Sequence, residues 1–191
     1  MPGAAEGGYG RVRVGGVWLD LKPEHIEFSD NLAMRRHVAA FKNNRPGKNG
    51  APTTGVAAEA FNIMGARCEC AAYLWAKPVK WHSFGESVRD LPDLDYFIDV
   101  KGVAQTRHSL IVQRHDPAEW AYLLVSSQEH PRYHLIGWMW GREAQQQKYW
   151  TDPVGGRAAY FVKPDDPALR SPGLLFDVLR AKQRSDAREA V

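Results

Sequence analysis

The chain has 191 residues, and its 25 Lys and Arg against 22 Asp and Glu give a net charge of +3. Hydrophobic residues make up 44% and charged residues 25%, a composition close to that of globular domains, which excludes extensive disorder. No apolar run approaches the roughly 20 residues of a membrane helix, and no signal-peptide pattern opens the chain. We therefore expect a cytoplasmic protein with one domain and no membrane partner.

The N-terminal third is predicted to hold a hairpin, a helix and a loop. Residues 11–21 alternate around two glycines, which is typical of a small hairpin. An apolar stripe predicts a helix that begins at Ser29 or Asp30 and ends near Phe41. Turn-forming residues over 43–55 predict a loop.

This part of the chain also has a local excess of positive charge. No acidic residue occurs from Asn31 to Ala58. The same stretch contains five cations, which are Arg35, Arg36, Lys42, Arg45 and Lys48. Such a segment attracts a polyanion and follows a phosphate backbone, but a solvated helix face with a loop has the same composition. Both interpretations stay open.

The remaining elements alternate in type along the chain. Residues 54–76 predict one helix broken at Gly65, or two short helices. Strands are predicted at 96–103, 109–113, 120–126, 133–140 and 158–162, a short polar helix at 142–149, and a helix from Leu169 onward. Helix, then strands, then helix is typical of an α+β or mixed α/β fold.

The most informative segment runs from Leu91 to Gly102. On a strand, Asp99 and Lys101 project from the same face. Charged neighbours at mid-strand are costly if buried without partners, and a cleft that holds a divalent cation would satisfy them. Asp93 lies before a bend that can bring a second carboxylate close, and the carbonyl of Val100 offers a neutral oxygen. In such a site Lys101 would polarise the attacking water and offset charge on a phosphate.

These residues resemble the signature of the PD-(D/E)XK nuclease superfamily, whose fold is restriction-endonuclease-like. The match consists of Pro92-Asp93 followed by Asp99-Val100-Lys101. The superfamily also carries an acidic residue on the preceding helix, in a segment Gly-x-x-Gly-Glu-x-Ala. Residues 65–71 are similar to it, so the resemblance implies that Glu69 is the helix acid, with Cys68 in place of the second glycine.

Two other acidic residues compete for these roles. Asp95 is an alternative to Asp93, although it leaves less room for a bend before Asp99. Glu59 is an alternative to Glu69, although it lies farther from the motif in sequence.

The resemblance implies a metal-dependent enzyme that hydrolyses phosphodiester bonds, with DNA as the expected substrate. It assigns Mg²⁺, with Mn²⁺ as a substitute, to the carboxylates of Glu69, Asp93 and Asp99 and the carbonyl of Val100. The catalytic residues would be these three acids and Lys101. It further implies that Gln105, a polar residue shortly after the lysine, lines the cleft that binds nucleic acid. From their position in the sequence, His108, seven residues after Lys101, and Arg107 beside it are candidates for contact with a phosphate.

The resemblance covers roughly residues 63–170 and includes a likeness to small nuclease-like proteins of tailed bacteriophages. It implies that residues 63–191 form a mixed sheet flanked by helices, with residues 1–62 as an extension packed on this core. A phage protein would act in the host cytoplasm, and cutting both strands of a duplex would favour a homodimer.

Two competing interpretations remain. Asp99 and Lys101 would form an exposed ion pair on an edge strand, worth about 0–1 kcal/mol, if the motif had no function. A catalytically inactive nuclease-like fold would instead serve as a module that binds DNA or a protein. Separately, Trp138 and Trp140 share a strand face that would either stack on bases or lie beneath the C-terminal helix.

Overall fold

The computed structural model describes residues 16–42, 55–77, 79–82, 91–95, 97–153 and 155–189. The first half of the predicted hairpin, most of the loop predicted at 43–55, and the cations Arg45 and Lys48 lie outside these described residues. None of the helices in the described ranges is long and apolar enough to cross a membrane.

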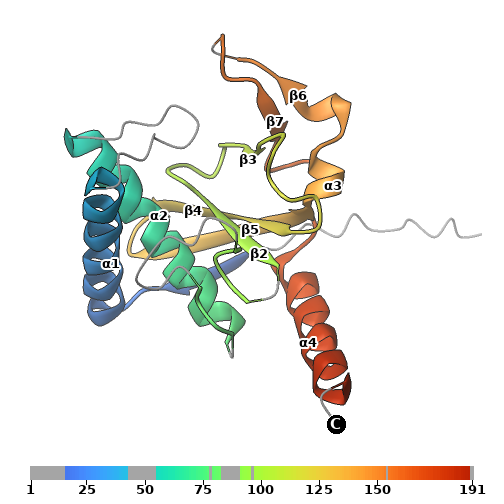
Figure 1. The fold of residues 1–191 in the computed structure, drawn as a ribbon, viewed down its shortest axis with the longest axis horizontal. Helices are drawn as coiled ribbons and strands as arrows, with labels where there is room; N and C mark the ends of the chain where they lie inside the picture. Colours follow the sequence, from blue (N-terminus) through green and yellow to red (C-terminus); the bar gives the residue numbers. More distant parts are fainter. Residues whose placement is uncertain are drawn as a thin grey trace, which may run out of the picture.

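The centre of the fold is a four-stranded sheet with both parallel and antiparallel pairs (Figure 1). Its strands lie in the order β1 (Val17–Asp20), β5 (Arg132–Trp140), β4 (Ala121–Glu129) and β2 (Ile98–Val103). β2 is parallel to β4, whereas the β4–β5 and β5–β1 pairs are antiparallel. The mixed sheet flanked by helices that the sequence predicts is therefore confirmed.

A second, smaller sheet packs beside the first. It consists of β3 (Leu110–Val112), β7 (Ala159–Val162) and β6 (Trp150–Thr151), all antiparallel. The sequence predicts β3 and β7 but not β6, because two residues are too few to show an alternating pattern.

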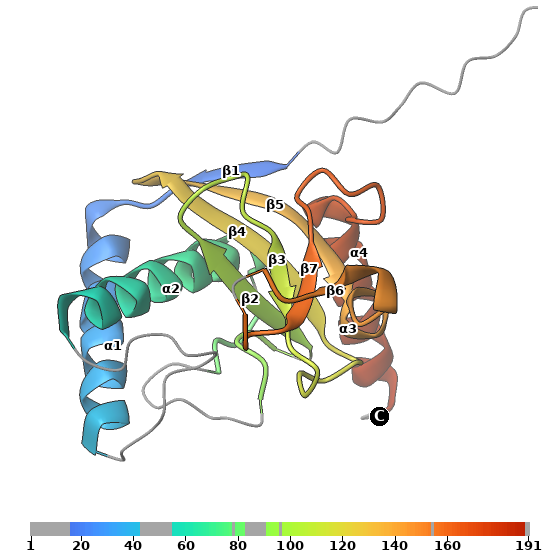
Figure 2. The same cartoon turned by 90° about the horizontal axis from the view of Figure 1, so that it is seen from above.

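Helices cover the main sheet. α2 (Gly55–Ala76) packs on β2 and β4, and α1 (Pro23–Lys42) packs on α2, farther from the sheet (Figure 2). α4 (Pro172–Glu189) contacts β5. The short helix α3 (Gly141–Ala144) and the 3-10 helix η2 (Gln147–Tyr149) contact β7 of the small sheet.

Alternate residues of β4 enter two different cores. Leu123 and Val125 pack into the core shared with α2, whereas Tyr122 and Leu124 pack into the core shared with the small sheet. Because both faces of β4 are covered, the strand is apolar at successive positions instead of alternating.

Two predicted helix features differ from the structure. α1 begins at Pro23 instead of Ser29 or Asp30, since a proline has no N–H to leave unpaired in the first turn. Ser29 is an interior residue whose hydroxyl donates to the carbonyl of His25 at 2.7 Å. The break predicted at Gly65 is wrong, because α2 is one continuous helix.

The N-terminal part of the chain packs on the rest of the molecule. α2 passes unbroken through residue 62, where the predicted extension ends. Leu21 and Leu32 lie in the same hydrophobic core as Trp81 and Leu94. The two parts of the chain therefore share one core.

The tryptophan pair of β5 belongs to the interior. Trp138 is 1% exposed, and its Nε1 donates to the carbonyl of Ser171, directly before α4. The half-buried Trp140 packs against Phe97 with ring centroids 5.3 Å apart. The covered sheet face is thus the correct alternative for Trp138.

Helix α2 approaches β2 closely at Gly102. A Cβ atom at this position would lie 3.0 Å from Cys68 Sγ and 3.1 Å from Cys68 Cβ. Burial, followed by the neighbouring charge of Glu69, raises the pKa of the Cys68 thiol to about 12, so this side chain packs as a neutral group. The small side chains at both positions allow the helix to sit directly on the motif-bearing strand.

We expect Gly102→Val to lower the free energy of unfolding by about 1–3 kcal/mol, because the added methyl groups overfill this contact. Gly65→Ala is the matched control, since a Cβ there meets nothing within 4 Å. The control should be neutral or stabilising by up to about 1 kcal/mol. Urea unfolding measures both, and equal stability of Gly102→Val and the wild type would contradict the packing argument.

Candidate functional site

Three charged side chains meet at β2. Asp99 and Lys101 share a face of the strand, as the alternation predicts, with Asp99 Oδ2 2.7 Å from Lys101 Nζ. The loop between β3 and β4 adds Asp116, whose Oδ2 lies 3.3 Å from the same nitrogen. Only 10% of the Asp99 side chain and 17% of the Lys101 side chain are exposed. The alternative of an exposed ion pair is therefore wrong, even though β2 lies at the end of the strand order.

Asp93 lies next to this group. A tight reversal, in which Leu94 bridges to Ile98, folds the chain back so that Asp93 comes beside the middle of the motif. Asp93 Oδ2 accepts the backbone N–H of Val100 at 2.8 Å. Asp99 belongs to the strand, and Asp93 is anchored by a hydrogen bond to Val100, the strand residue directly after it.

The alternative residue Asp95 faces a different part of the molecule. Its Oδ2 accepts the backbone N–H of Lys80 at 2.6 Å, and its Oδ1 lies 2.9 Å from His82 Nε2. Asp95 therefore holds the segment 79–82 in place, whereas Asp93 accompanies Asp99 and Lys101.

The carboxylates keep Lys101 charged. Burial lowers the pKa of the Lys101 amine, but Asp99, Asp116 and Asp93 together outweigh burial and hold the pKa above its ordinary value. The ammonium also lies 5.0 Å from the ring centroid of Tyr122. At neutral pH the side chain therefore acts as a positive charge and hydrogen-bond donor, not as a base.

Asp116 is the member of this group that the sequence analysis does not identify. Its carboxylate also accepts the backbone N–H of Gln113 at 3.0 Å, and Gln145 Nε2 donates to the Asp116 carbonyl at 2.7 Å. The residue is 9% exposed. It sits in a polar loop before a proline, 15 positions from Lys101, so no spacing pattern distinguishes it from a surface turn residue.

Glu69 occupies a separate polar contact between α1 and α2. Its Oε1 and Oε2 accept from the two terminal nitrogens of Arg36 at 2.9 and 2.8 Å. Trp81 Nε1 donates to Oε2 at 2.9 Å. Only 12% of the Glu69 side chain is exposed, so it joins the helices and segment 79–82 through a largely buried ion pair. Its competitor Glu59 is partly exposed nearer the start of α2.

The structure thus brings together only part of the predicted site. Asp99 and Asp116 contact Lys101, the charge of Asp93 helps to raise the Lys101 pKa, and Val100 lies between the two motif residues of β2. Over the described ranges, no three His, Cys, Asp or Glu side chains are grouped so that they could hold a metal ion. Glu69 is accordingly not joined to Asp93 and Asp99 in such a group.

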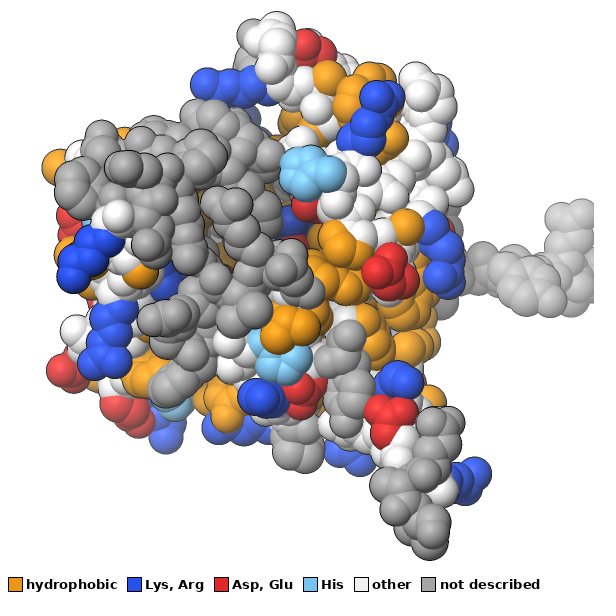
Figure 3. Space-filling view, viewed as in Figure 1, with side chains coloured by type: hydrophobic (Ala, Val, Ile, Leu, Met, Phe, Trp, Pro, Cys, Tyr) orange, Lys and Arg blue, Asp and Glu red, His pale blue; other side chains and the backbone are white. Residues whose placement is uncertain are grey.

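The residues predicted to contact nucleic acid are spread over two regions. Arg35 and Lys42 are exposed on α1, but Arg36 directs its guanidinium at Glu69 and its side chain is only 14% exposed. Figure 3 shows Lys and Arg side chains over the side of the molecule where α1 lies, with acidic side chains among them. In the loop after β2, Gln105 Oε1 accepts from Arg107 Nε at 2.6 Å, and Arg107 and His108 are exposed.

Comparisons with known proteins add no relative. No family model matches the sequence, no curated protein matches it, and no solved structure matches the fold. The function is therefore inferred from the residues and their geometry.

Proposed function

We propose that the protein is a metal-dependent nuclease of the PD-(D/E)XK type that hydrolyses phosphodiester bonds in DNA. The observation that carries the proposal is that Asp93, from the loop before β2, lies beside the strand that carries Asp99 and the largely buried, charged Lys101. The spacing of Pro92-Asp93 and Asp99-Val100-Lys101 supports it independently. Buried charges of this kind are costly for a structural strand, which favours a functional role.

The residues around Lys101 fit a hard cation in their chemistry. All three acids offer carboxylate oxygens, which Mg²⁺ prefers, and three carboxylates against one ammonium leave an excess of negative charge. Mg²⁺ commonly binds through one or two carboxylates, with waters and substrate phosphate as the other ligands. Asp93 and Asp99 would hold it, with the Val100 carbonyl beside them. When bound, the cation would activate water and neutralise charge on the phosphate.

The chain's own groups would then position the reactants. Lys101 would donate a hydrogen bond to the attacking water or to a phosphate oxygen, where its fixed positive charge stabilises the transition state. Asp116 would hold the Lys101 side chain in place from the loop between β3 and β4. Asp93 would fix the start of the motif through the N–H of Val100.

Cleavage assays test the proposal directly. Purified protein is incubated with supercoiled plasmid, linear duplex and single-stranded DNA in Mg²⁺, in Mn²⁺ and in EDTA. We expect cleavage of at least one substrate with either metal and none in EDTA. Intact DNA of all three kinds after incubation with both metals would contradict the proposal.

A second function is favoured by one particular contact. Because Glu69 is engaged by Arg36 and Trp81, the helix acid of the resemblance serves here as a structural group. A nuclease-like fold that binds DNA or a protein without turnover would tolerate this arrangement. DNA binding that persists in the same assays, with no metal-dependent cutting, would select this alternative.

A further inference from the structure

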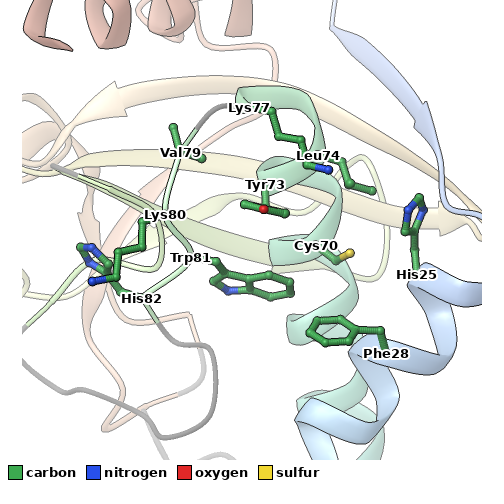
Figure 4. Close-up of a pocket in the computed structure, with 10 residues that line it drawn as sticks. All are labelled: His25, Phe28, Cys70, Tyr73, Leu74, Lys77, Val79, Lys80, Trp81 and His82. Carbon is green, nitrogen blue, oxygen red and sulfur yellow. The ribbon is translucent and has the colours of Figure 1, made fainter.

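A pocket of about 540 Å³ opens between α1, α2 and segment 79–82 (Figure 4). Its size is typical of sites for small ligands. The lining combines aromatic rings from three elements with two lysines, and no residue given above for the Asp99–Lys101 group lines it. The pocket is therefore separate from the candidate catalytic group.

The aromatic wall is held in a fixed orientation. Tyr73 and Trp81 are stacked, with centroids 5.6 Å apart and an interplanar angle of 28°, and Phe28 lies 6.0 Å from Trp81. The Trp81 indole N–H donates to buried Glu69, which prevents the ring from turning. Phe28 is 41% exposed, so part of this apolar wall faces solvent. A planar ring can pack on such a wall with little loss of side-chain freedom.

The rim of the pocket is positively charged. Lys77 and Lys80 are exposed, and Lys77 Nζ lies 5.2 Å from the Tyr73 ring centroid. None of the described residues that line the pocket is acidic. The lining therefore complements a ligand that joins a planar ring to a negative charge, which is the chemistry of a nucleobase with its phosphate.

The pocket wall is directly connected to the motif. Trp81 bridges to Leu94, and the His82 N–H donates to the Asp93 carbonyl at 2.9 Å. Segment 80–82 is thus paired with segment 93–95, which carries the first motif carboxylate. A nucleotide in the pocket would lie on the chain segment paired with Asp93.

We propose that this pocket binds a nucleotide, with the base packed on Phe28, Tyr73 and Trp81 and its phosphate held by Lys77, whose ammonium lies over the Tyr73 ring. Lys80 points to the other side of Trp81, where it would contact a neighbouring phosphate of a bound strand. This assignment rests on the proposed function: the nucleotide would be an unpaired one in the DNA strand next to the bond that is cut. A free mononucleotide has the same base and phosphate as a nucleotide within a strand, so the experiment below separates these two ligands.

Binding is measured in EDTA, where no cleavage occurs, using thymidine 5′-monophosphate, a short labelled single strand and a blunt duplex. We expect Phe28→Ala to weaken single-strand binding by roughly 5- to 150-fold, the loss of one stacked base. Lys77→Ala/Lys80→Ala should weaken it and reduce its salt dependence. The matched controls are Phe61→Ala, 54% exposed on α2, and Lys163→Ala, exposed after β7. Neither control residue lines the pocket, and both variants should bind like the wild type.

Each outcome decides the proposal. Tighter binding of the single strand than of the mononucleotide supports a nucleotide within a strand, and equal binding supports a free nucleotide. Unchanged binding in both pocket variants, or no binding of any probe, overturns the pocket assignment. If the wild type cuts DNA but the pocket variants bind normally, the nucleotide-binding assignment of the pocket is contradicted and the proposed nuclease function is supported. If the pocket variants lose binding and the wild type never cuts DNA, the proposed nuclease function is contradicted and the nucleotide-binding assignment of the pocket is supported.

Discussion

Asp99→Asn is expected to lower the rate of Mg²⁺-dependent DNA cleavage by roughly 100-fold or more, because the amide removes a negative oxygen that a hard cation requires. The change keeps the size of a side chain that is 10% exposed and leaves Lys101 in contact with Asp116. The protein should therefore still fold. Initial rates on supercoiled plasmid, measured beside thermal unfolding, check both parts of this expectation.

Two substitutions of the same kind are controls for Asp99→Asn. Asp177→Asn changes an exposed residue of α4 and should leave the rate unaltered. Asp95→Asn separates the two acids that compete for the first motif position, since Asp95 faces Lys80 and His82. We expect it to retain metal-dependent cutting. Wild-type cleavage by folded Asp99→Asn protein would remove this residue from the catalytic assignment.

Glu69→Ala is expected to lower the free energy of unfolding by about 3–5 kcal/mol, because it removes the carboxylate that pairs with the Arg36 guanidinium in a largely buried contact. Arg36 would lose two hydrogen bonds and Trp81 would lose one. Urea unfolding measures the loss. A change below about 1 kcal/mol, the range of exposed pairs, would contradict the buried ion pair.

The double variant Arg36→Met/Glu69→Leu separates a structural from a catalytic role of Glu69. Replacing both members of a buried ion pair by apolar side chains is often neutral, so stability should return toward that of the wild type. Cleavage by this stable variant would assign Glu69 to structure alone. Loss of cleavage in a variant of normal stability would return Glu69 to the catalytic set that the sequence resemblance implies.

Local patterns in the sequence predict the central part of the fold well. The strand that carries Asp99 and Lys101 and the shared face of these residues follow from alternation over a few positions. The predicted start of α1 is wrong, because Ser29 has the chemistry of a cap but donates to a carbonyl within the helix. Gly65 predicts a break that the structure does not show, because packing between α2 and β2 outweighs the low helix propensity of one glycine.

Contacts between distant positions account for what sequence reasoning missed in the site. Arg36 and Glu69 are 33 residues apart, and nothing in either local segment indicates that they pair. Local composition therefore places Arg36 with the cations of a basic surface, whereas the structure pairs it with Glu69. Asp116 likewise reaches Lys101 only through the fold of the loop between β3 and β4.

The shared core has a consequence for how ligands act on this protein. Trp81 of the pocket wall and Val100 of the motif strand belong to the same buried cluster as Leu21 from the first part of the chain. Regions that share a core unfold cooperatively, so anything that binds the folded state at one place raises the melting temperature of the whole. A divalent ion at β2 and a nucleotide between α1 and α2 would each protect the other's binding surface against thermal opening.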